Sequence, residues 1–155
     1  MTRDDKIFLR AWRVETRESM ACFNRRTDDI LASSSRSVPM NEGCREIVLN
    51  HLDWYSESLS PLISVTVDRD WAFHEARRRK MQGMTNVVVH EICISKSRLH
   101  KYERRGSRVI YKRISRWLDL AKTKLPEYAS YASTNQEFLF LYRIPGIFIV
   151  KTFEI

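Results

Sequence analysis

The sequence predicts a single α+β domain. Segments typical of strands and segments typical of helices are mixed along the 155 residues, without the regular alternation of a doubly wound parallel sheet. Hydrophobic residues make up 43% of the chain and charged residues 30%, a balance typical of a globular protein. A chain of this length can bury roughly two-thirds of its unfolded surface, which is enough for one core.

Five apolar segments are predicted to be strands: residues 6–14, 62–67, 86–94, 138–144 and 147–153. The third is the clearest, because it is rich in the β-branched residues that favour a pleated sheet. Pro145-Gly146, a turn dipeptide, separates the last two. These strands supply the β part of the predicted fold.

Three segments are predicted to be helices: residues 41–55, 69–82 and 110–125. Asn41 and Asp68 are the expected N-caps of the first two, and Gly83 is expected to end the second. The third carries one apolar stripe and should end or bend at Pro126. The apolar positions that support the first and third helices are Ile47, Val48, Leu52, Tyr55, Ile110, Ile114, Trp117, Leu118, Ala121 and Leu125.

In the segment between the first predicted strand and the first predicted helix, the apolar residues follow no clear period. Residues 32–37 read Ala-Ser-Ser-Ser-Arg-Ser, a composition typical of a loop. We expect a mobile loop over residues 32–40. Trp71, in contrast, is expected to pack inside, because it lies in the second helix with Ala72, Phe73 and Ala76.

Three of the strand-like segments each carry polar side chains of a different chemical type. The first contains Arg10, the second contains Ser64 and Thr66, and Glu137 opens the apolar run near the end of the chain. Ser64 and Thr66 lie two residues apart and therefore share one face of their strand. A guanidinium inside an apolar strand normally needs an anionic partner. These residues are the candidates for a binding or catalytic site.

The order of an arginine, a Ser-x-Thr strand and a late glutamate resembles the R-S-E arrangement of ADP-ribosyltransferases, which split NAD at its nicotinamide bond. Residues 60–66, SPLISVT, and residues 137–145, EFLFLYRIP, also resemble a fungal domain family of uncharacterised function that is itself similar to those enzymes. The resemblance runs from about Phe8 to Phe153. It implies a split, strongly bent β-sandwich core with flanking helices, and NAD bound as a substrate in the cleft between its halves.

The resemblance also implies a role for each candidate. Glu137 would stabilise the positive, oxocarbenium-like ribose that forms as the bond breaks. Arg10 would hold the pyrophosphate with its forked guanidinium, and Arg13 is the alternative if the strand register differs. Ser64 would orient Glu137, while Thr66 would line the nicotinamide pocket.

One position departs from the pattern. Transferases of this type that modify a protein or nucleic-acid acceptor usually carry Glu or Gln two residues before the catalytic glutamate, where this chain has Asn135. Gln136 is adjacent but would face the other way in a regular strand. Hydrolysis of NAD would need Glu137 alone. Two functions other than cleavage of NAD are also compatible with the sequence. The protein could be a catalytically inactive relative that acts as an effector or binding module, or it could be a nucleic-acid-binding domain.

The net charge of +8 is concentrated in one segment. Nine Lys and Arg residues lie between positions 96 and 116, against a single acid, Glu103. Such a segment can attract a nucleic acid, an acidic protein or anionic phospholipid, or it can be a solvated face. The residues expected to contact a partner are Lys96, Lys101, Arg104, Arg105 and Arg108.

Cysteine and histidine spacing predicts no metal site. Cys22, Cys44 and Cys93 form no CxxC pair, so we expect reduced thiols rather than a disulfide framework. The histidines are expected to be structural or exposed; they are His51, His74, His90 and His100. No apolar run approaches the ~18 residues of a membrane span. We therefore expect a cytoplasmic protein without membrane contact, or one that acts inside a host cell after loss of a signal peptide.

Overall fold

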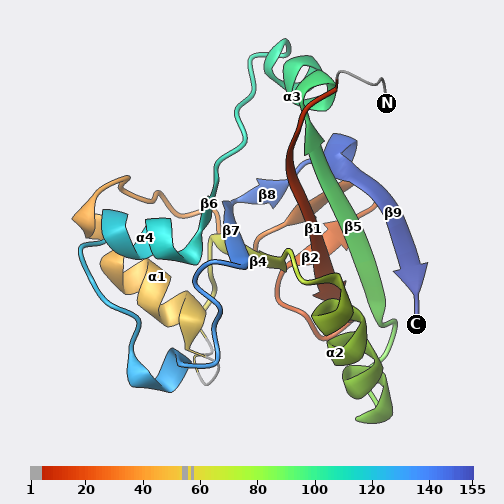
Figure 1. Ribbon diagram of the computed structural model, residues 1–155, viewed down its shortest axis with the longest axis horizontal. Helices are drawn as coiled ribbons and strands as arrows, with labels where there is room; N and C mark the ends of the chain where they lie inside the picture. The colour runs from red at the N-terminus through yellow and green to blue at the C-terminus, as the bar shows by residue number, and fades with distance from the viewer. Residues whose placement is uncertain (1–4, 54–55, 57) are drawn as a thin grey trace.

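The computed structural model describes residues 5–53, 56 and 58–155 and forms a single α+β domain, as predicted (Figure 1). The main sheet has six strands in the order β6-β7-β4-β1-β5-β9, and a smaller sheet has the order β2-β3-β8. All the pairings between these strands are antiparallel. No helix in the described part of the chain is long and apolar enough to cross a membrane.

The strands are β1 Ile7–Glu15, β2 Cys22–Asn24, β3 Asp29–Leu31, β4 Leu62–Thr66, β5 Val88–Ser95, β6 Tyr111–Arg113, β7 Glu137–Leu141, β8 Arg143–Ile144 and β9 Ile149–Glu154. The α-helices are α1 Arg45–Leu52, α2 Arg69–Met81, α3 Lys96–Glu103 and α4 Ile114–Leu120. Short 3₁₀ helices cover Glu42–Cys44, Glu127–Ala129 and Gly146–Phe148.

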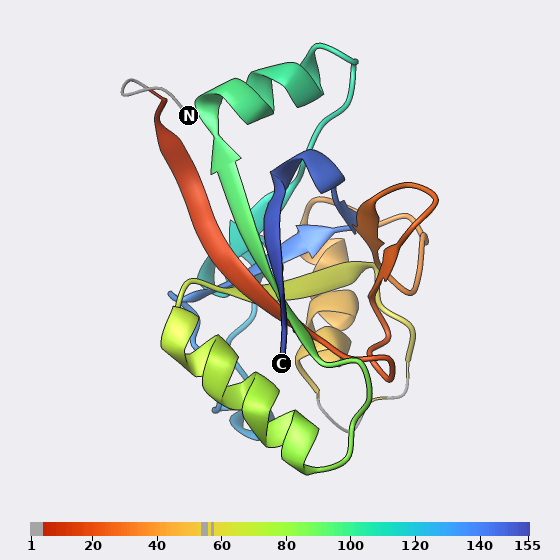
Figure 2. The same ribbon diagram turned by 90° about the vertical axis from the view of Figure 1, so that its right-hand side faces the viewer.

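The main sheet is split between β1 and β4. β1 pairs with β5 along its whole length, and β4 pairs with β7 along its whole length. Between them, the single register pair is Trp12 opposite Thr66. In Figure 2, β4 accordingly crosses the direction of β1, β5 and β9 instead of running beside them. The edge of β4 that faces β1 therefore needs other partners for its main-chain polar groups.

On one face of the main sheet, helices cover the two ends but not the middle. At one end, α1 and α4 pack on Leu62 of β4 and Leu139 of β7, with Trp117 of α4 in the same apolar cluster. At the other end, α2 packs its Ala72 on Trp12. Between these two apolar clusters lie the polar positions of β4 and β7, because Thr66 pairs with both Trp12 and Glu137 and so shares this face with them. The fold thus leaves a polar strip exposed between two covered regions.

The opposite face carries a continuous apolar core. It joins Leu9, Ile63, Val65 and Phe140 of the main sheet to Ile30 of the smaller sheet. The alternation along β4, with Ile63 and Val65 on this side and Ser64 and Thr66 on the other, fixes which side chains reach the helix-covered face.

Local sequence signals explain several element boundaries. The Asp68 carboxylate accepts a hydrogen bond from the Trp71 N–H and caps α2, and Asn41 accepts one from the Gly43 N–H before the first 3₁₀ helix. Gly83, with φ 89°, follows α2 in the left-handed conformation expected of a residue just beyond a helix end. These three signals act as the sequence predicts.

Other predicted elements are wrong in detail. Residues 96–103 form the helix α3, which carries no fully buried residue; Leu99 and Tyr102 pack partly against the core, an apolar stripe too short to reveal the helix. The predicted helix 110–125 is in fact the short strand β6 followed by α4, and Ile110 precedes both. Trp71 is 46% exposed rather than packed. Tyr142, with φ 68°, interrupts the predicted strand 138–144.

The first third of the chain contains a hairpin that periodicity does not reveal. β2 and β3 pair with each other, and β3 pairs with β8 to build the smaller sheet. Residues 32–40 form neither helix nor strand, which agrees with the predicted loop. The helix expected over residues 41–55 begins as a 3₁₀ turn and continues to Leu52. Tyr55, assigned to its apolar stripe, lies outside the described residues.

Candidate active site in the split of the sheet

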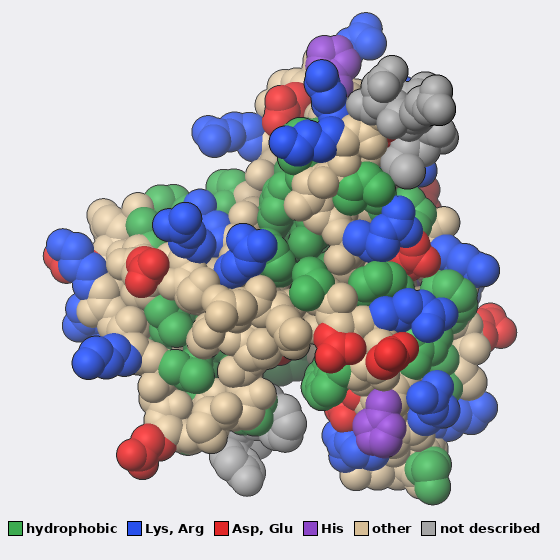
Figure 3. All heavy atoms as spheres, viewed as in Figure 1, with side chains coloured by type: hydrophobic (Ala, Val, Ile, Leu, Met, Phe, Trp, Pro, Cys, Tyr) green, Lys and Arg blue, Asp and Glu red, His purple; other side chains and the backbone are tan. Residues whose placement is uncertain are grey.

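A cleft of about 480 Å³ opens over the exposed middle of the main sheet. Its floor is β4, and its walls come from α1, α2, the segment before β7 and the segment after β1. Figure 3 shows this recess between the left-hand lobe and the lower right-hand lobe of the molecule. Its volume lies within the range of pockets that bind small molecules and cofactors.

Glu137 lies at the head of β7, on the floor of this cleft. It stands directly opposite Thr66 in the β4–β7 pair, and Glu137 Oε2 accepts a hydrogen bond of 2.5 Å from the Ser133 N–H. Burial raises the pKa of Glu137 above its ordinary value, while the bond from Ser133 opposes the rise. The cleft therefore holds a partly desolvated carboxyl group on rigid backbone.

Ser64 and Thr66 line the same cleft, as their shared strand face predicts. Ser64 Oγ lies 2.7 Å from Nε2 of His51, a residue of α1, and the contacts described for its hydroxyl do not include Glu137. Thr66 Oγ1 accepts a hydrogen bond from the Asp68 N–H. The expected orientation of Glu137 by Ser64 is thus replaced by a contact between Ser64 and an imidazole.

His51 connects two serine hydroxyls. Its Nδ1 lies 2.7 Å from Ser60 Oγ, and its Nε2 lies 2.7 Å from Ser64 Oγ. A neutral imidazole donates at one nitrogen and accepts at the other, so one hydroxyl donates to the ring and the other accepts from it. Burial, together with the positive charge of Arg13, lowers the pKa of His51 to about 4. The ring is therefore neutral at neutral pH and is a weak base, which suits it to holding Ser64 rather than deprotonating it.

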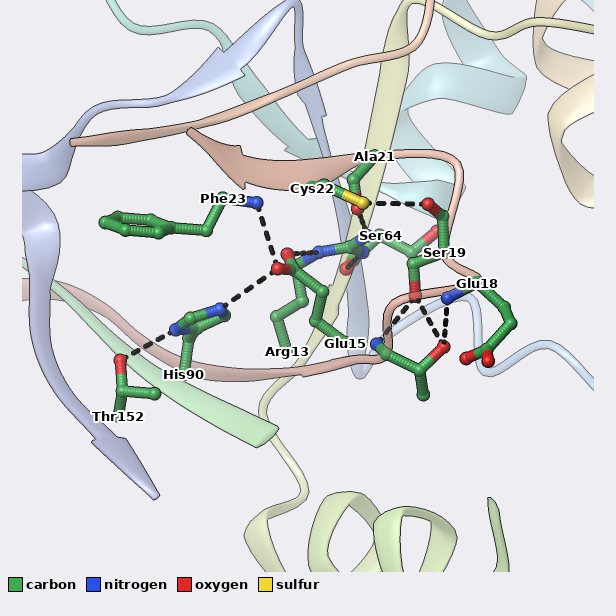
Figure 4. Close-up of polar contacts among 11 residues, drawn as sticks. Arg13, Glu15, Glu18, Ser19, Ala21, Cys22, Phe23, Ser64, His90 and Thr152 are labelled. Atoms are coloured by element: carbon green, nitrogen blue, oxygen red, sulfur yellow. Dashed lines mark hydrogen bonds and ion pairs between the residues drawn. The ribbon is translucent and has the colours of Figure 1, made fainter. Parts of the chain in front are cut away.

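Arg13 reaches the cleft and closes the gap between the two halves of the sheet (Figure 4). Its Nη1 donates to the main-chain oxygen of Ser64 at 3.0 Å, and its Nη2 donates to that of Ala21 at 2.8 Å. Its Nε lies 3.6 Å from Glu15 Oε1. The unpaired edge of β4 thus receives a side-chain donor where β1 has diverged from it.

Glu15 balances the charge of Arg13 inside the protein. Glu15 Oε2 accepts a hydrogen bond from the Phe23 N–H at 2.9 Å and lies 3.5 Å from His90 Nε2, and His90 Nδ1 in turn lies 2.8 Å from Thr152 Oγ1 (Figure 4). Burial alone would raise the pKa of Glu15, but the interactions with His90, Phe23 and Arg13 hold it below its ordinary value. Arg13 is therefore fixed by a buried network.

Arg10 lies outside this cleft. Its side chain is 42% exposed and its Nη1 pairs with Glu91 Oε2 at 2.7 Å on the neighbouring strand β5. The structure therefore brings Ser64, Thr66 and Glu137 together with Arg13. Arg13, the alternative candidate, thus takes the place in the cleft that was expected of Arg10.

Of the two acceptor-side residues, Gln136 lines the cleft, whereas Asn135 is exposed and does not. β7 begins at Glu137, so Gln136 lies just outside the strand. The alternation of side chains between the two faces of a strand, which would point Gln136 away from Glu137, therefore does not hold for it. Sequence reasoning also missed Trp71 and Tyr131, which line the cleft as well.

His51 is the most informative residue that sequence reasoning missed. It lies four residues after Ile47 and three after Val48, both buried, so it belongs to the inward stripe of α1. A histidine on such a stripe is a sign of a buried polar contact. The spacing of residues along α1 does not reveal that the partner of His51 is Ser64.

Comparison with known proteins places the chain in a family without assigning an activity. No curated protein and no solved structure matches it. The family match covers residues 9–155, nearly the whole chain, and the protein belongs to the DUF7587 family, described as a domain of unknown function.

Proposed function

We propose that the cleft binds NAD and cleaves its nicotinamide–ribose bond. The observation that carries this proposal is the position of Glu137, a partly buried carboxyl group on the floor of a cleft that it shares with Arg13, Ser64 and Thr66. The split between β1 and β4 supports a bent core of the ADP-ribosyltransferase type with the substrate between its halves.

The reaction requires a negative charge beside the sugar. As the bond between C1′ of the ribose and the nicotinamide nitrogen breaks, nicotinamide leaves with the electron pair and the ribose becomes positive. The Glu137 carboxylate stabilises that charge, since it is held by backbone and partly shielded from water. Water then adds to C1′ and loses a proton, giving ADP-ribose. An acceptor nucleophile would replace water in a transfer reaction, and Gln136 is the residue beside Glu137 that could contact it.

The phosphates of NAD would lie towards the cationic side of the cleft. Arg13 supplies a fixed positive charge there, although both of its Nη atoms already donate to main-chain oxygens. Arg79 of α2 also lines the cleft and pairs with Glu75 at 2.8 Å. The pyrophosphate would therefore lie near the positive charges of Arg13 on β1 and Arg79 on α2, and not in contact with the guanidinium of Arg10.

The test is release of nicotinamide from NAD by the purified protein and by Glu137→Gln. The substitution keeps the shape of the side chain and removes its negative charge. We therefore expect the release of nicotinamide to fall by about 10²–10³-fold, a loss typical of removing one electrostatic interaction from an active site. Glu154→Gln is the matched control, because Glu154 is exposed and is not among the residues that line the cleft.

Two outcomes would count against the proposal. Equal release by the parent and Glu137→Gln, after purification by two independent routes, would remove Glu137 from the mechanism. Binding of NAD by calorimetry without any release would favour the alternative of an inactive binding module.

A further inference from the structure

A second concave surface, separate from the cleft, combines aromatic rings with basic side chains. This groove of about 690 Å³ lies between the start of β1, the edge strand β6 and α4. Its lining residues do not include any of those that line the cleft. Phe138 belongs to the groove and Glu137 to the cleft, and neighbouring residues of one strand point to opposite faces of the sheet.

Rings from two strands face this groove. Phe8 of β1 is 43% exposed, which is unusual for a phenylalanine in a strand of a main sheet. Tyr111 of β6 is half-buried and stacks on Phe140, with ring centroids 5.4 Å apart. Phe8 thus offers aromatic surface that the core does not use, whereas Tyr111 packs on the core through one side and leaves the rest of its ring towards the groove.

The cations of the groove are free of carboxylate partners. Arg113 lies over the ring of Phe138, 4.9 Å from its centroid, and Lys112 lies 6.0 Å from the centroid of Trp117. The salt bridges among the described residues include neither of these side chains, nor Arg116. Asp119 is the one acid among the lining residues. The local charge therefore stays positive.

More basic side chains lie on the last turn of α3 and on the chain that connects α3 to β6. Lys101, Arg104, Arg105 and Arg108 are exposed, and the salt bridges of the described residues leave them unpaired as well. Figure 3 shows basic side chains around the α3 end at the top and on the left-hand lobe, with hydrophobic surface between them. Positive charge thus lies on both sides of an apolar, partly aromatic strip.

From this combination we infer that the groove binds single-stranded nucleic acid, with bases stacked on Phe8 and Tyr111 and phosphates held by Arg113, Arg116 and the flanking cations. Stacking needs exposed rings and unpaired bases, and a positive track along the strand supplies the remaining affinity. A duplex hides the faces of its bases, and an acidic protein would not require exposed rings. The inference is independent of the proposed reaction with NAD.

The experiment measures binding of a short fluorescein-labelled oligo(U) strand by anisotropy over a series of salt concentrations. For R113Q/R116Q we expect weaker binding and a log–log salt slope lowered by about 1.4, since each phosphate contact on a single strand contributes about 0.7. R25Q/R26Q is the matched control, because it removes the same charge from exposed positions between β2 and β3.

Phe8→Ala tests the stacking part. We expect it to weaken binding at least about five-fold, as loss of one base–aromatic stack does, with the salt slope unchanged. Phe8→Leu keeps an apolar side chain without the aromatic ring and should show the same loss, which guards against a folding defect in the alanine variant.

Three results would overturn the inference. One is an R113Q/R116Q protein that binds oligo(U) with the affinity and slope of R25Q/R26Q. Another is a duplex that binds as tightly as the single strand while Phe8→Ala changes nothing, which would indicate a basic surface alone. The third is displacement of oligo(U) by a polyglutamate peptide with no effect of Phe8→Ala, which would favour an acidic protein.

Discussion

The guanidinium of Arg13 donates a hydrogen bond to the main-chain oxygen of Ser64 at the place where β1 and β4 stop pairing. The imidazole of His51 holds the hydroxyl of the same serine. Ser64 is therefore fixed from both its backbone and its side chain, on the floor of the cleft. One buried cation closes the sheet and positions a residue of the candidate site.

Arg13→Ala should strongly destabilise the protein. The change leaves Glu15 without its nearest cation and leaves the oxygens of Ser64 and Ala21 without a donor. Breaking a buried charge pair costs about 3–5 kcal/mol. Arg10→Ala, which removes a partly exposed pair with Glu91, should cost at most about 1 kcal/mol. Urea denaturation of both variants measures the difference, and similar losses would show that Arg13 is not the central cation of the fold.

His51 should make the protein less stable in mild acid. Its pKa is about 4 in the folded protein, against ~6.5 in the unfolded chain. As the pH falls from about 6.5 towards 4, the unfolded chain takes up a proton that the folded protein does not, so the free energy of unfolding decreases, by an amount on the order of 2 kcal/mol. His51→Gln, whose amide can contact both serines without titrating, should lack this decrease.

The measurement for His51 is the change in urea midpoint between pH 7 and pH 5 for the parent and for His51→Gln. His100→Gln is the control, because His100 is exposed on α3. If the parent and His51→Gln lose the same stability on acidification, the imidazole does not titrate as its burial indicates.

The parts of the fold that could be predicted are those with local signals. The alternation of apolar and polar side chains along β4 and the helix cap at Asp68 each depend on residues that are close in sequence, and both are found as expected. α3 carries no such signal, because none of its residues is fully buried and its one clear mark is the Ser95 cap. The Tyr142 interruption depends on a backbone conformation that is rare outside glycine, and the sequence there reads as continuous strand.

The candidate site could be predicted only as far as strand alternation reaches. Alternation puts Ser64 and Thr66 on one face, but the choice between Arg10 and Arg13 depends on where β1 diverges from β4, which is a tertiary property. The register of β1 against β5 is regular from Leu9 to Glu15, so Arg10 and Arg13, which are three residues apart, lie on opposite faces of the strand. His51 reaches Ser64 because α1 packs on the end of the sheet, and no spacing along the chain encodes that contact.

Glu137→Gln should raise stability at neutral pH while it lowers the release of nicotinamide by about 10²–10³-fold. The pKa of Glu137 is raised in the folded protein because burial penalises its charged form. Above that pKa the folded protein carries a carboxylate that the unfolded chain hydrates better, so replacing it with a neutral amide of the same shape favours folding.

The gain in stability of Glu137→Gln over the parent protein should depend on pH. The advantage of Glu137→Gln should be greatest near pH 7 and should shrink as the pH falls through the raised pKa, where the parent carboxyl group becomes neutral. The Ser133 N–H keeps an acceptor in both proteins, because the amide oxygen can replace Oε2. Thermal unfolding at pH 7 and pH 4 measures the effect, and each kcal/mol gained corresponds to roughly 3 °C. A residue kept for structure would lose stability on substitution at both pH values, whereas a charge kept at a strained site for catalysis gains stability and loses activity. Finding a lower melting temperature for Glu137→Gln at pH 7 would assign Glu137 to the fold rather than to the chemistry of the cleft.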